Sequence, residues 1–183
     1  MTNASSFSSA RPSEVQSLID RFRLIPHPEG GYYREVYRSD LLAQRIPCGS
    51  KDASPDPTGR ESDAVRSALT DIYFLLEAGD FSRFHRVDSD EAWHHLAGGP
   101  LQLVLISPDL TEQLTLTIEP ATIGEAIGVV PANWWQAAIP QSTYTICSCS
   151  VGPGFDFKDF EMAQDVPLGD QIKLAYPKLA HLV

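Results

Sequence analysis

Residues 85–99, HRVDSDEAWHHLAGG, concentrate histidine and carboxylate side chains in a short stretch of chain. Such side chains bind transition metals and also transfer protons in acid–base catalysis. Either role requires several of these side chains to converge on one point. Whether they converge depends on the strands that carry them. Strand alternation puts Glu91 and His95 on one face, about 13 Å apart, and His94 on the other. We therefore expect His94 and His95 to make ordinary hydrogen bonds outside any site with Glu91.

The composition is that of one globular domain, with 183 residues, of which 43% are hydrophobic and 21% charged. The formal net charge of -10 argues against nucleic acid or an anionic membrane as a partner, because no basic surface could neutralise the phosphates. No stretch approaches the roughly 18 apolar residues of a membrane-spanning helix. Cys147 and Cys149 share a strand face, where they cannot bridge without distortion, so we expect buried thiols and a reducing cytoplasm.

The chain should begin with a disordered leader over residues 1–12, followed by one helix. Ser13 and Gln16 form an S-x-x-Q capping box. An apolar helix face follows, formed by Val15, Leu18, Ile19 and Phe22. This helix should end near Leu24, before Pro26 and Pro28, and pack on the outside of the structure that follows.

From Tyr32 onward the pattern becomes that of short strands. They are expected over residues 32–38, 67–76, 81–87, 91–97, 101–106, 113–118, 126–130, 134–139 and 143–151. Eight or nine short strands with no helix between them predict an all-β sandwich or barrel. Residues 46–63 are rich in proline, glycine and polar residues, which indicates a long loop that is mobile or acts as a lid. Residues 171–182 could form a short C-terminal helix.

The first stretch resembles a known motif. In the cupin superfamily, H-x-H is followed after three or four residues by E and after six more by G, across two strands of a jelly-roll barrel. His85, Glu91 and Gly98 match this pattern, whereas Val87 stands in place of the second histidine.

Residues 124–136, GEAIGVVPANWWQ, are similar to the second cupin motif. Pro131 matches the motif proline, although its gap from the glycine is one residue longer. Asn133 replaces the turn glycine, which is physically reasonable because Asn tolerates the left-handed backbone conformation. Gln136 takes the place of the last histidine ligand.

Four blocks together resemble the cupin-5 (DUF985) family of the RmlC-like cupins, over about residues 18–162. They are residues 28–39, 81–99, 130–138 and 151–163. The resemblance implies a jelly-roll β-barrel and commonly a homodimer, but no established reaction. The expected organisation is one cupin domain over residues 13–183, with a core of about 28–162, an N-terminal helix and a short C-terminal helical segment.

Cupin metal sites use three histidines and a glutamate. Here only His85 and Glu91 match, since valine cannot ligate and the Gln136 amide is a weak neutral ligand. The sequence therefore predicts no tightly held metal. A loosely held divalent ion on His85, Glu91 and Gln136 stays open as an alternative.

A metal-free barrel can still hold a small molecule in its mouth. The candidate catalytic residues are His85 as base, Glu91 as its partner and Tyr73 as acid. The candidate ligand-binding residues are Arg83, Trp93, Gln136, Tyr33 and Glu35. Arg83 could equally be a solvated rim charge, and Tyr73 a core aromatic residue.

Four further segments carry weaker expectations. PEGG, residues 28–31, is either a tight turn with positive-φ glycines or a segment crossing the barrel mouth. His27 is expected to be a turn residue, and Asp88 and Asp90 to be structural in a turn. Arg86 is expected to pair with an acidic residue at a subunit contact.

Three functions remain open. The first is an isomerase or epimerase that transfers protons on a small sugar-, nucleotide- or organic-acid-like metabolite without a tightly held metal. It is similar in kind to the metal-free sugar-nucleotide epimerases of the superfamily. The second is a weakly metal-dependent oxygenase or hydrolase, and the third is a non-catalytic ligand-binding module.

Overall fold

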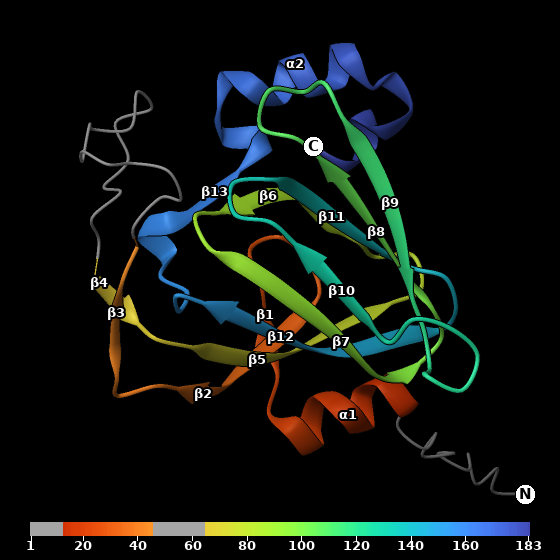
Figure 1. Cartoon of the computed structure of the whole chain (residues 1–183). Coiled ribbons are helices and arrows are strands. Elements are labelled where there is room, and N and C mark those ends of the chain that lie inside the picture. The colour runs from red at the N-terminus through yellow and green to blue at the C-terminus, as the bar shows by residue number, and fades with distance from the viewer. Residues whose placement is uncertain (1–12, 46–64) are drawn as a thin grey trace, which may run out of the picture.

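The computed structural model describes residues 13–45 and 65–183. The leader predicted over residues 1–12, the loop predicted over 46–63 and the third cysteine, Cys48, lie outside the described residues. Two antiparallel sheets face each other in the described chain, as Figure 1 shows. This arrangement confirms the predicted all-β jelly-roll barrel of the cupins.

One sheet has six strands, in the order β1-β2-β5-β12-β7-β10. Their bounds are β1 (Ile25–Pro26), β2 (Tyr32–Arg38), β5 (Thr70–Glu77), β12 (Tyr144–Gly152), β7 (Asp90–Gly98) and β10 (Ile127–Val130). The other sheet has the order β13-β6-β11-β8-β9, with β13 (Phe160–Met162), β6 (Ser82–Val87), β11 (Trp135–Pro140), β8 (Leu101–Ile106) and β9 (Gln113–Ile118). A separate pair joins β3 (Leu42–Gln44) to β4 (Val65–Ser67).

The apolar run of β8 reflects burial of this strand on both faces. Leu103 points into the barrel, where it packs with Phe74 and Trp93. Val104, its neighbour, packs on the opposite face against the C-terminal segment that carries Ile172. A strand covered on both sides is expected to be continuously apolar, as LQLVLI is.

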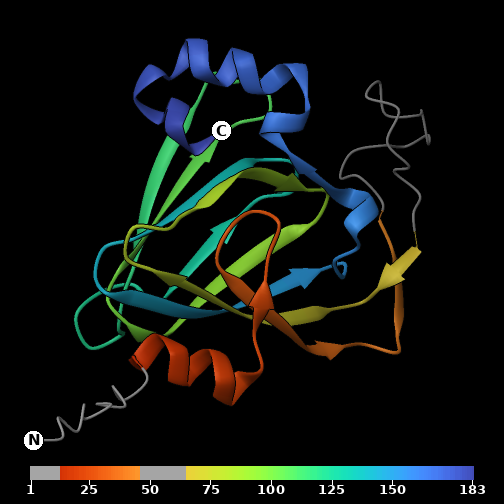
Figure 2. The same ribbon diagram turned by 180° about the vertical axis from the view of Figure 1, so that it is seen from behind.

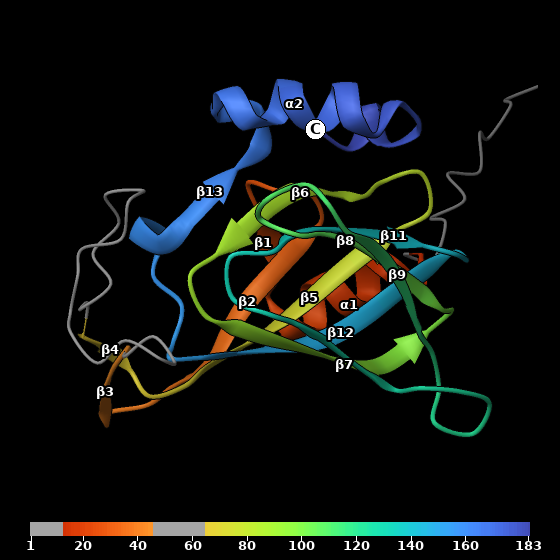
Figure 3. The ribbon, with the colours of Figure 1, turned by 45° about the horizontal axis from the view of Figure 1, so that its top comes forward.

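The C-terminal segment covers the outer face of the five-stranded sheet. It comprises two short 3₁₀ helices, η2 (Ala163–Asp165) and η3 (Pro177–Leu182), and one α-helix, α2 (Pro167–Ala175). A further 3₁₀ helix, η1 (Phe157–Asp159), lies before β13. Figure 3 shows β13 running along β6 and leading into α2. The sequence placed a single helix over 171–182, but Pro177 ends α2 and starts η3 because proline cannot continue the preceding helix.

The N-terminal helix α1 (Glu14–Phe22) covers the outer face of the six-stranded sheet, opposite α2 (Figures 1 and 2). Its predicted N-cap is confirmed, since the Ser13 hydroxyl accepts the backbone N–H of Gln16 at 3.1 Å. The Gln16 side chain does not complete the capping box and instead donates to Asp20 at 2.9 Å. The helix ends at Arg23, whose φ of 53° is left-handed.

Candidate functional site

A cavity of about 610 Å³ opens between the two sheets. Aromatic side chains form much of its wall, namely Tyr33, Phe74, Trp93, Phe155, Phe157 and Phe160. Three buried polar side chains also line it, Glu29, His85 and Glu91, together with His27. The lining also includes five charged residues, namely Arg23, Arg34, Glu35, Arg38 and Asp156.

The turn between β1 and β2 carries Glu29 into this cavity, and Figure 2 shows it reaching between the two sheets. Gly30 and Gly31 have φ values of 117° and 65°, which confirms the predicted positive-φ glycines. A Cβ on Gly30 would lie 2.2 Å from the carbonyl oxygen of Phe81, so no larger residue fits. The Gly31 N–H donates to Asp80 at 2.9 Å and fixes the turn.

Glu29 joins two histidines in a buried cluster. Its Oε2 lies 3.2 Å from Nε2 of His85 and 3.2 Å from Nδ1 of His27. Its Oε1 accepts the hydroxyl of Ser82 at 2.9 Å. Nδ1 of His85 lies 2.8 Å from the carbonyl of Arg83, an arrangement in which that nitrogen must donate. The contact between His85 Nε2 and Glu29 is then attractive only when one of the two carries a further proton, so the cluster can take up and release a proton.

The two histidines and Ser82 set the ionisation state of the Glu29 carboxyl group. Burial alone would raise the pKa of this carboxyl, but the positive charge available on His85 and His27 and the hydrogen bonds from His27 and Ser82 outweigh it. The net effect lowers the pKa of Glu29 below its usual range. The pKa of His85 is lowered as well, because burial outweighs the charge of Glu29 and the hydrogen bond to the Arg83 carbonyl. The lowered pKa of Glu29 favours an ionised carboxylate over a protonated one at neutral pH.

Glu91, at the start of β7, has different partners. Its Oε2 accepts the side-chain N–H of Gln136 at 2.6 Å, and the Gln136 oxygen accepts the indole N–H of Trp93 at 3.0 Å. Burial and the nearby charge of Glu29 raise the pKa of Glu91 to about 8, and the hydrogen bond from Gln136 offsets this only in part. Glu91 is therefore mostly protonated at neutral pH, and its other oxygen has no hydrogen-bond partner in residues 13–45 and 65–183.

The side chains at the cupin ligand positions do not fit a metal ion. The Gln136 oxygen is already bonded to Trp93, Nε2 of His85 faces Glu29, and Val87 lines the cavity as an apolar group. No group of three His, Cys, Asp or Glu side chains in the described chain is arranged to hold a metal ion.

Five of the residues singled out from the sequence line the cavity. These are His85, Glu91, Trp93, Tyr33 and Glu35. Gln136 lies behind the lining, fully buried, where it links Glu91 to Trp93. His85 is partnered by Glu29, whereas the sequence analysis assigned Glu91 to that position.

Tyr73 and Arg83 lie outside the cavity, contrary to expectation. Tyr73 points out of the barrel toward α1, with its ring 4.8 Å from that of Phe22, because Phe74 takes the inward position. Arg83 lies over the ring of Phe81 and donates to the backbone carbonyl of Glu29 at 3.3 Å. Arg83 thus supports the turn that carries Glu29.

Several cavity residues are absent from the sequence candidates, among them Arg23 and Arg34 and the two members of the buried cluster, His27 and Glu29. His27 is a turn residue, as expected, since its carbonyl accepts the N–H of Gly30 at 3.1 Å, but its buried ring also lies 4.5 Å from that of Tyr33 and lines the cavity. The one available signal was PEGG, where two successive glycines indicate a special turn that could cross the barrel mouth.

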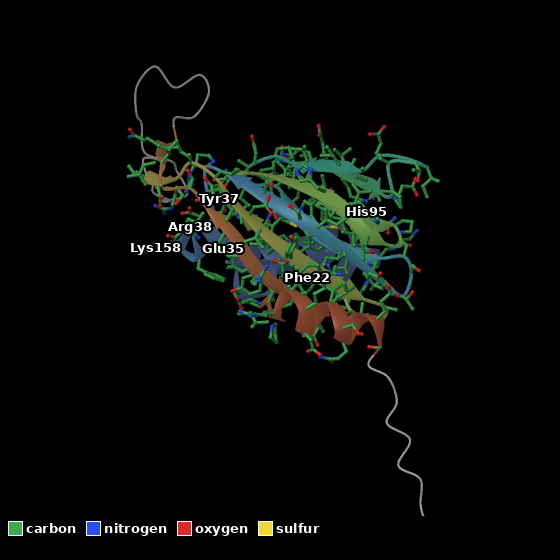
Figure 4. The ribbon with its side chains drawn as sticks, turned by 90° about the horizontal axis from the view of Figure 1, so that it is seen from below. Phe22, Glu35, Tyr37, Arg38, His95 and Lys158 are labelled. Carbon is green, nitrogen blue, oxygen red and sulfur yellow. The ribbon has the colours of Figure 1, made fainter. Side chains whose placement is uncertain are left out.

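The remaining residues of the opening stretch are peripheral. His95 bonds the Gly99 carbonyl at 3.0 Å, and Figure 4 places it at the opposite end of the sheet from Glu35. Asp90 accepts the N–H of Ala132 at 2.8 Å, as a turn residue. Arg86 was expected at a subunit contact, but it pairs with Glu161 of the same chain at 2.6 Å.

Comparison with known proteins adds the family. The family model described as "Cupin superfamily (DUF985)", Cupin_5, matches residues 16–163. The chain belongs to the Cupin_5 family. An uncharacterized protein of Saccharomyces cerevisiae is 30% identical over 155 residues, which are 81% of this chain and 74% of that protein.

Several solved structures have a fold similar to that of this chain. A hypothetical protein from Leishmania major is 30% identical, with a TM-score of 0.71 over 91% of this chain and 94% of that one. Protein SO0799 from Shewanella oneidensis is also 30% identical, with a TM-score of 0.68 over 91% and 92%. A variant of Bacillus subtilis oxalate decarboxylase is 11% identical, with a TM-score of 0.51 over 90% of this Cupin_5 chain and 38% of the enzyme, which shows a shared fold alone.

Among the described helices of this Cupin_5 chain, none combines the length and the apolar character needed to cross a bilayer.

Proposed function

We propose that this Cupin_5 protein binds a small polar metabolite in the cavity and transfers protons on it, as isomerases and epimerases do, without a tightly held metal. One observation carries the proposal: two buried carboxyl groups line the same cavity with different partners, Glu29 between two histidines and Glu91 beside the Gln136 amide. The histidines help to lower the pKa of Glu29, whereas burial raises the pKa of Glu91 to about 8. Surroundings that separate two pKa values in this way give Glu91 a proton to donate and leave Glu29 ionised, able to orient a histidine base.

The geometry suggests which atoms take part. Glu91 has a free oxygen and a proton to give, so it is the acid. His27 lines the cavity, its Nδ1 faces Glu29, and its Nε2 has no partner among the described residues, so it is the base. Both nitrogens of His85 are engaged, so His85 positions Glu29 and does not contact the ligand.

In the reaction that we propose, Nε2 of His27 takes a proton from the carbon next to a ligand carbonyl. Glu91 gives its proton to the carbonyl oxygen, and an enol forms. Return of the two protons, with carbon reprotonated at another face or position, completes the isomerisation and restores both groups. The aromatic wall, including Tyr33 and Trp93, would hold a planar or ring-shaped body.

Deuterium exchange tests this proposal without knowledge of the product. The protein is incubated in D₂O with sugars, organic acids and nucleotides, and NMR detects deuterium at carbon. We expect exchange on at least one compound, lost in Glu91→Gln and in His27→Gln but kept in Glu112→Gln, which changes an exposed residue.

Two outcomes would contradict the proposal. A compound that raises the melting temperature without any exchange would indicate a non-catalytic binding module. Exchange or turnover that is lost on dialysis against EDTA and restored by a divalent ion would indicate the weakly metal-dependent alternative.

A further inference from the structure

The arginines that line the cavity differ in their partners. Arg38 is fully engaged, because it donates to both carboxylate oxygens of Glu35, at 2.7 and 3.0 Å, and to the carbonyl of Phe155 at 3.1 Å. Arg23 and Arg34 form no ion pair with any residue in the described parts of the chain. Nε of Arg34 is buried without a hydrogen-bond partner there. A buried donor left unpaired is costly, so this group calls for an explanation.

The fold brings Arg23 and Arg34 to the same edge of the cavity. Tyr73 pairs with Arg34 across β5 and β2, and the Arg34 guanidinium lies 5.7 Å from the centre of the Tyr73 ring. The same ring touches Phe22, the last residue of α1, and Arg23 follows directly. Figure 4 shows Phe22 where the helix meets the sheet. Tyr73 itself lies on the outer face, and both arginines line the cavity from the β1–β2 edge of the six-stranded sheet.

We propose that Arg23 and Arg34 form an anion-binding subsite at the mouth of the cavity, so that the ligand carries a carboxylate or a phosphate at one end. This inference rests on the proposed function in one respect, the use of this cavity as the ligand site. Guanidinium groups present planar forks of N–H donors that match both anions.

The subsite shares one cavity with the acid–base groups, because Arg23, Arg34, His27 and Glu91 all belong to its lining. An anion held by the arginines leaves the other end of a small molecule free to extend along the cavity to Glu91 and His27. Glu91, being protonated, can donate a hydrogen bond to a carbonyl there without repelling a negatively charged ligand. The ligand class is a small acidic carbonyl compound with a flat or ring-shaped body.

Four probes that share one ring test the charge preference: benzoate, phenyl phosphate, benzyl alcohol and benzylamine, each measured by calorimetry. We expect at least one of the two anions to bind about tenfold or more tightly than benzyl alcohol, and benzylamine to bind more weakly than either anion. Comparison of benzoate with phenyl phosphate tells whether the natural ligand is a carboxylate or a phosphate.

The variants assign the preference to residues. Arg23→Gln and Arg34→Gln should each weaken binding of the preferred anion about tenfold and leave benzyl alcohol unchanged, whereas Arg34→Lys should keep part of the affinity. Arg21→Gln is the matched control, because Arg21 lies on the last turn of the same helix but does not line the cavity. Melting temperatures confirm that each variant is folded.

Several results would overturn the subsite. These are equal affinity for the four probes, tighter binding of benzylamine, no binding of any probe up to its solubility limit, or the same loss in Arg21→Gln. The deuterium-exchange experiment tests the proposed reaction independently of the subsite. Preferential binding of anions without deuterium exchange would contradict the proposed reaction but support the subsite. Deuterium exchange on a ligand whose affinity is unchanged in both arginine variants would support the reaction but contradict the subsite.

Discussion

The turn that carries Glu29 and the strand end that carries Glu91 put the same functional group into one cavity and give it opposite properties. Both carboxyl groups are almost completely buried, at 5% and 6% residue exposure. Glu29 meets two imidazoles, which can hold positive charge, and Glu91 meets only a neutral amide. Burial raises the pKa in both places, so the chemistry of the partner decides the outcome. Substitution of each carboxyl group and each of its partners tests whether the partner sets the pKa.

The largest effect is expected from Glu29→Ala. This change leaves two histidines and the Ser82 hydroxyl without their shared acceptor, and loss of one member of such a buried charged cluster typically costs about 3 to 5 kcal/mol. Urea denaturation at neutral pH measures the loss. Glu35→Ala is the control, because Glu35 pairs with Arg38 while 41% exposed and should cost no more than about 1 kcal/mol. Equal losses would show that the Glu29 cluster stabilises no more than a surface pair.

Glu91→Gln should change how the free energy of unfolding depends on pH. Between pH of about 4.5 and about 8 the folded chain keeps the Glu91 proton and the unfolded chain has lost it, so wild-type stability falls as pH rises. The slope from this group approaches about 1.4 kcal/mol per pH unit. The variant lacks that contribution, so its stability relative to wild type should increase across this interval and level off above it. Parallel curves for the two proteins would refute the raised pKa of Glu91.

His85→Asn tests the other carboxyl group, Glu29, whose pKa is lowered rather than raised. A lowered pKa means that Glu29 stabilises the folded chain at neutral pH and that this contribution is lost as pH falls through the folded pKa. Without His85, burial dominates and raises the pKa of Glu29. We expect a loss of about 1 to 3 kcal/mol at pH 7, which shrinks as the pH is lowered toward 4. Thermal unfolding over this range measures it, and a loss independent of pH would mean that His85 acts through packing alone.

The two regions also differ in how far the sequence predicts them. Glu91 belongs to a strand motif with fixed spacing, so its place in the barrel followed from the resemblance. Glu29 reaches the site through a turn, and its hydroxyl partner Ser82 lies 53 residues away. No periodicity links two such segments, and PEGG predicts a turn without saying what the turn faces.

The errors at Tyr73 and Arg83 have a different physical origin. Tyr73 and Phe74 are adjacent aromatic residues, so strand alternation alone does not tell which one points inward. The packing of α1 on the outer face decides it. Arg83 was assigned the parity of His85, but the pairing of β11 with β6 shifts register between Gln136 and Ala138. Bulges of this kind break the alternation on which the assignment depended.

The smallest effect is expected from Trp93→Phe, which removes the indole N–H that orients Gln136. Loss of one buried hydrogen bond costs about 1 kcal/mol. The amide is then free to turn away from Glu91, which should raise the pKa of Glu91 further and extend the fall in stability above pH 8. Trp135→Phe is the matched control, because Trp135 is equally buried and its indole N–H has no partner in the described chain. The difference between the two variants, measured by urea denaturation from pH 6 to 9, isolates the hydrogen bond. If it vanished at every pH, Trp93 would not set the orientation of Gln136, and burial and the charge of Glu29 would be left to account for the protonated state of Glu91.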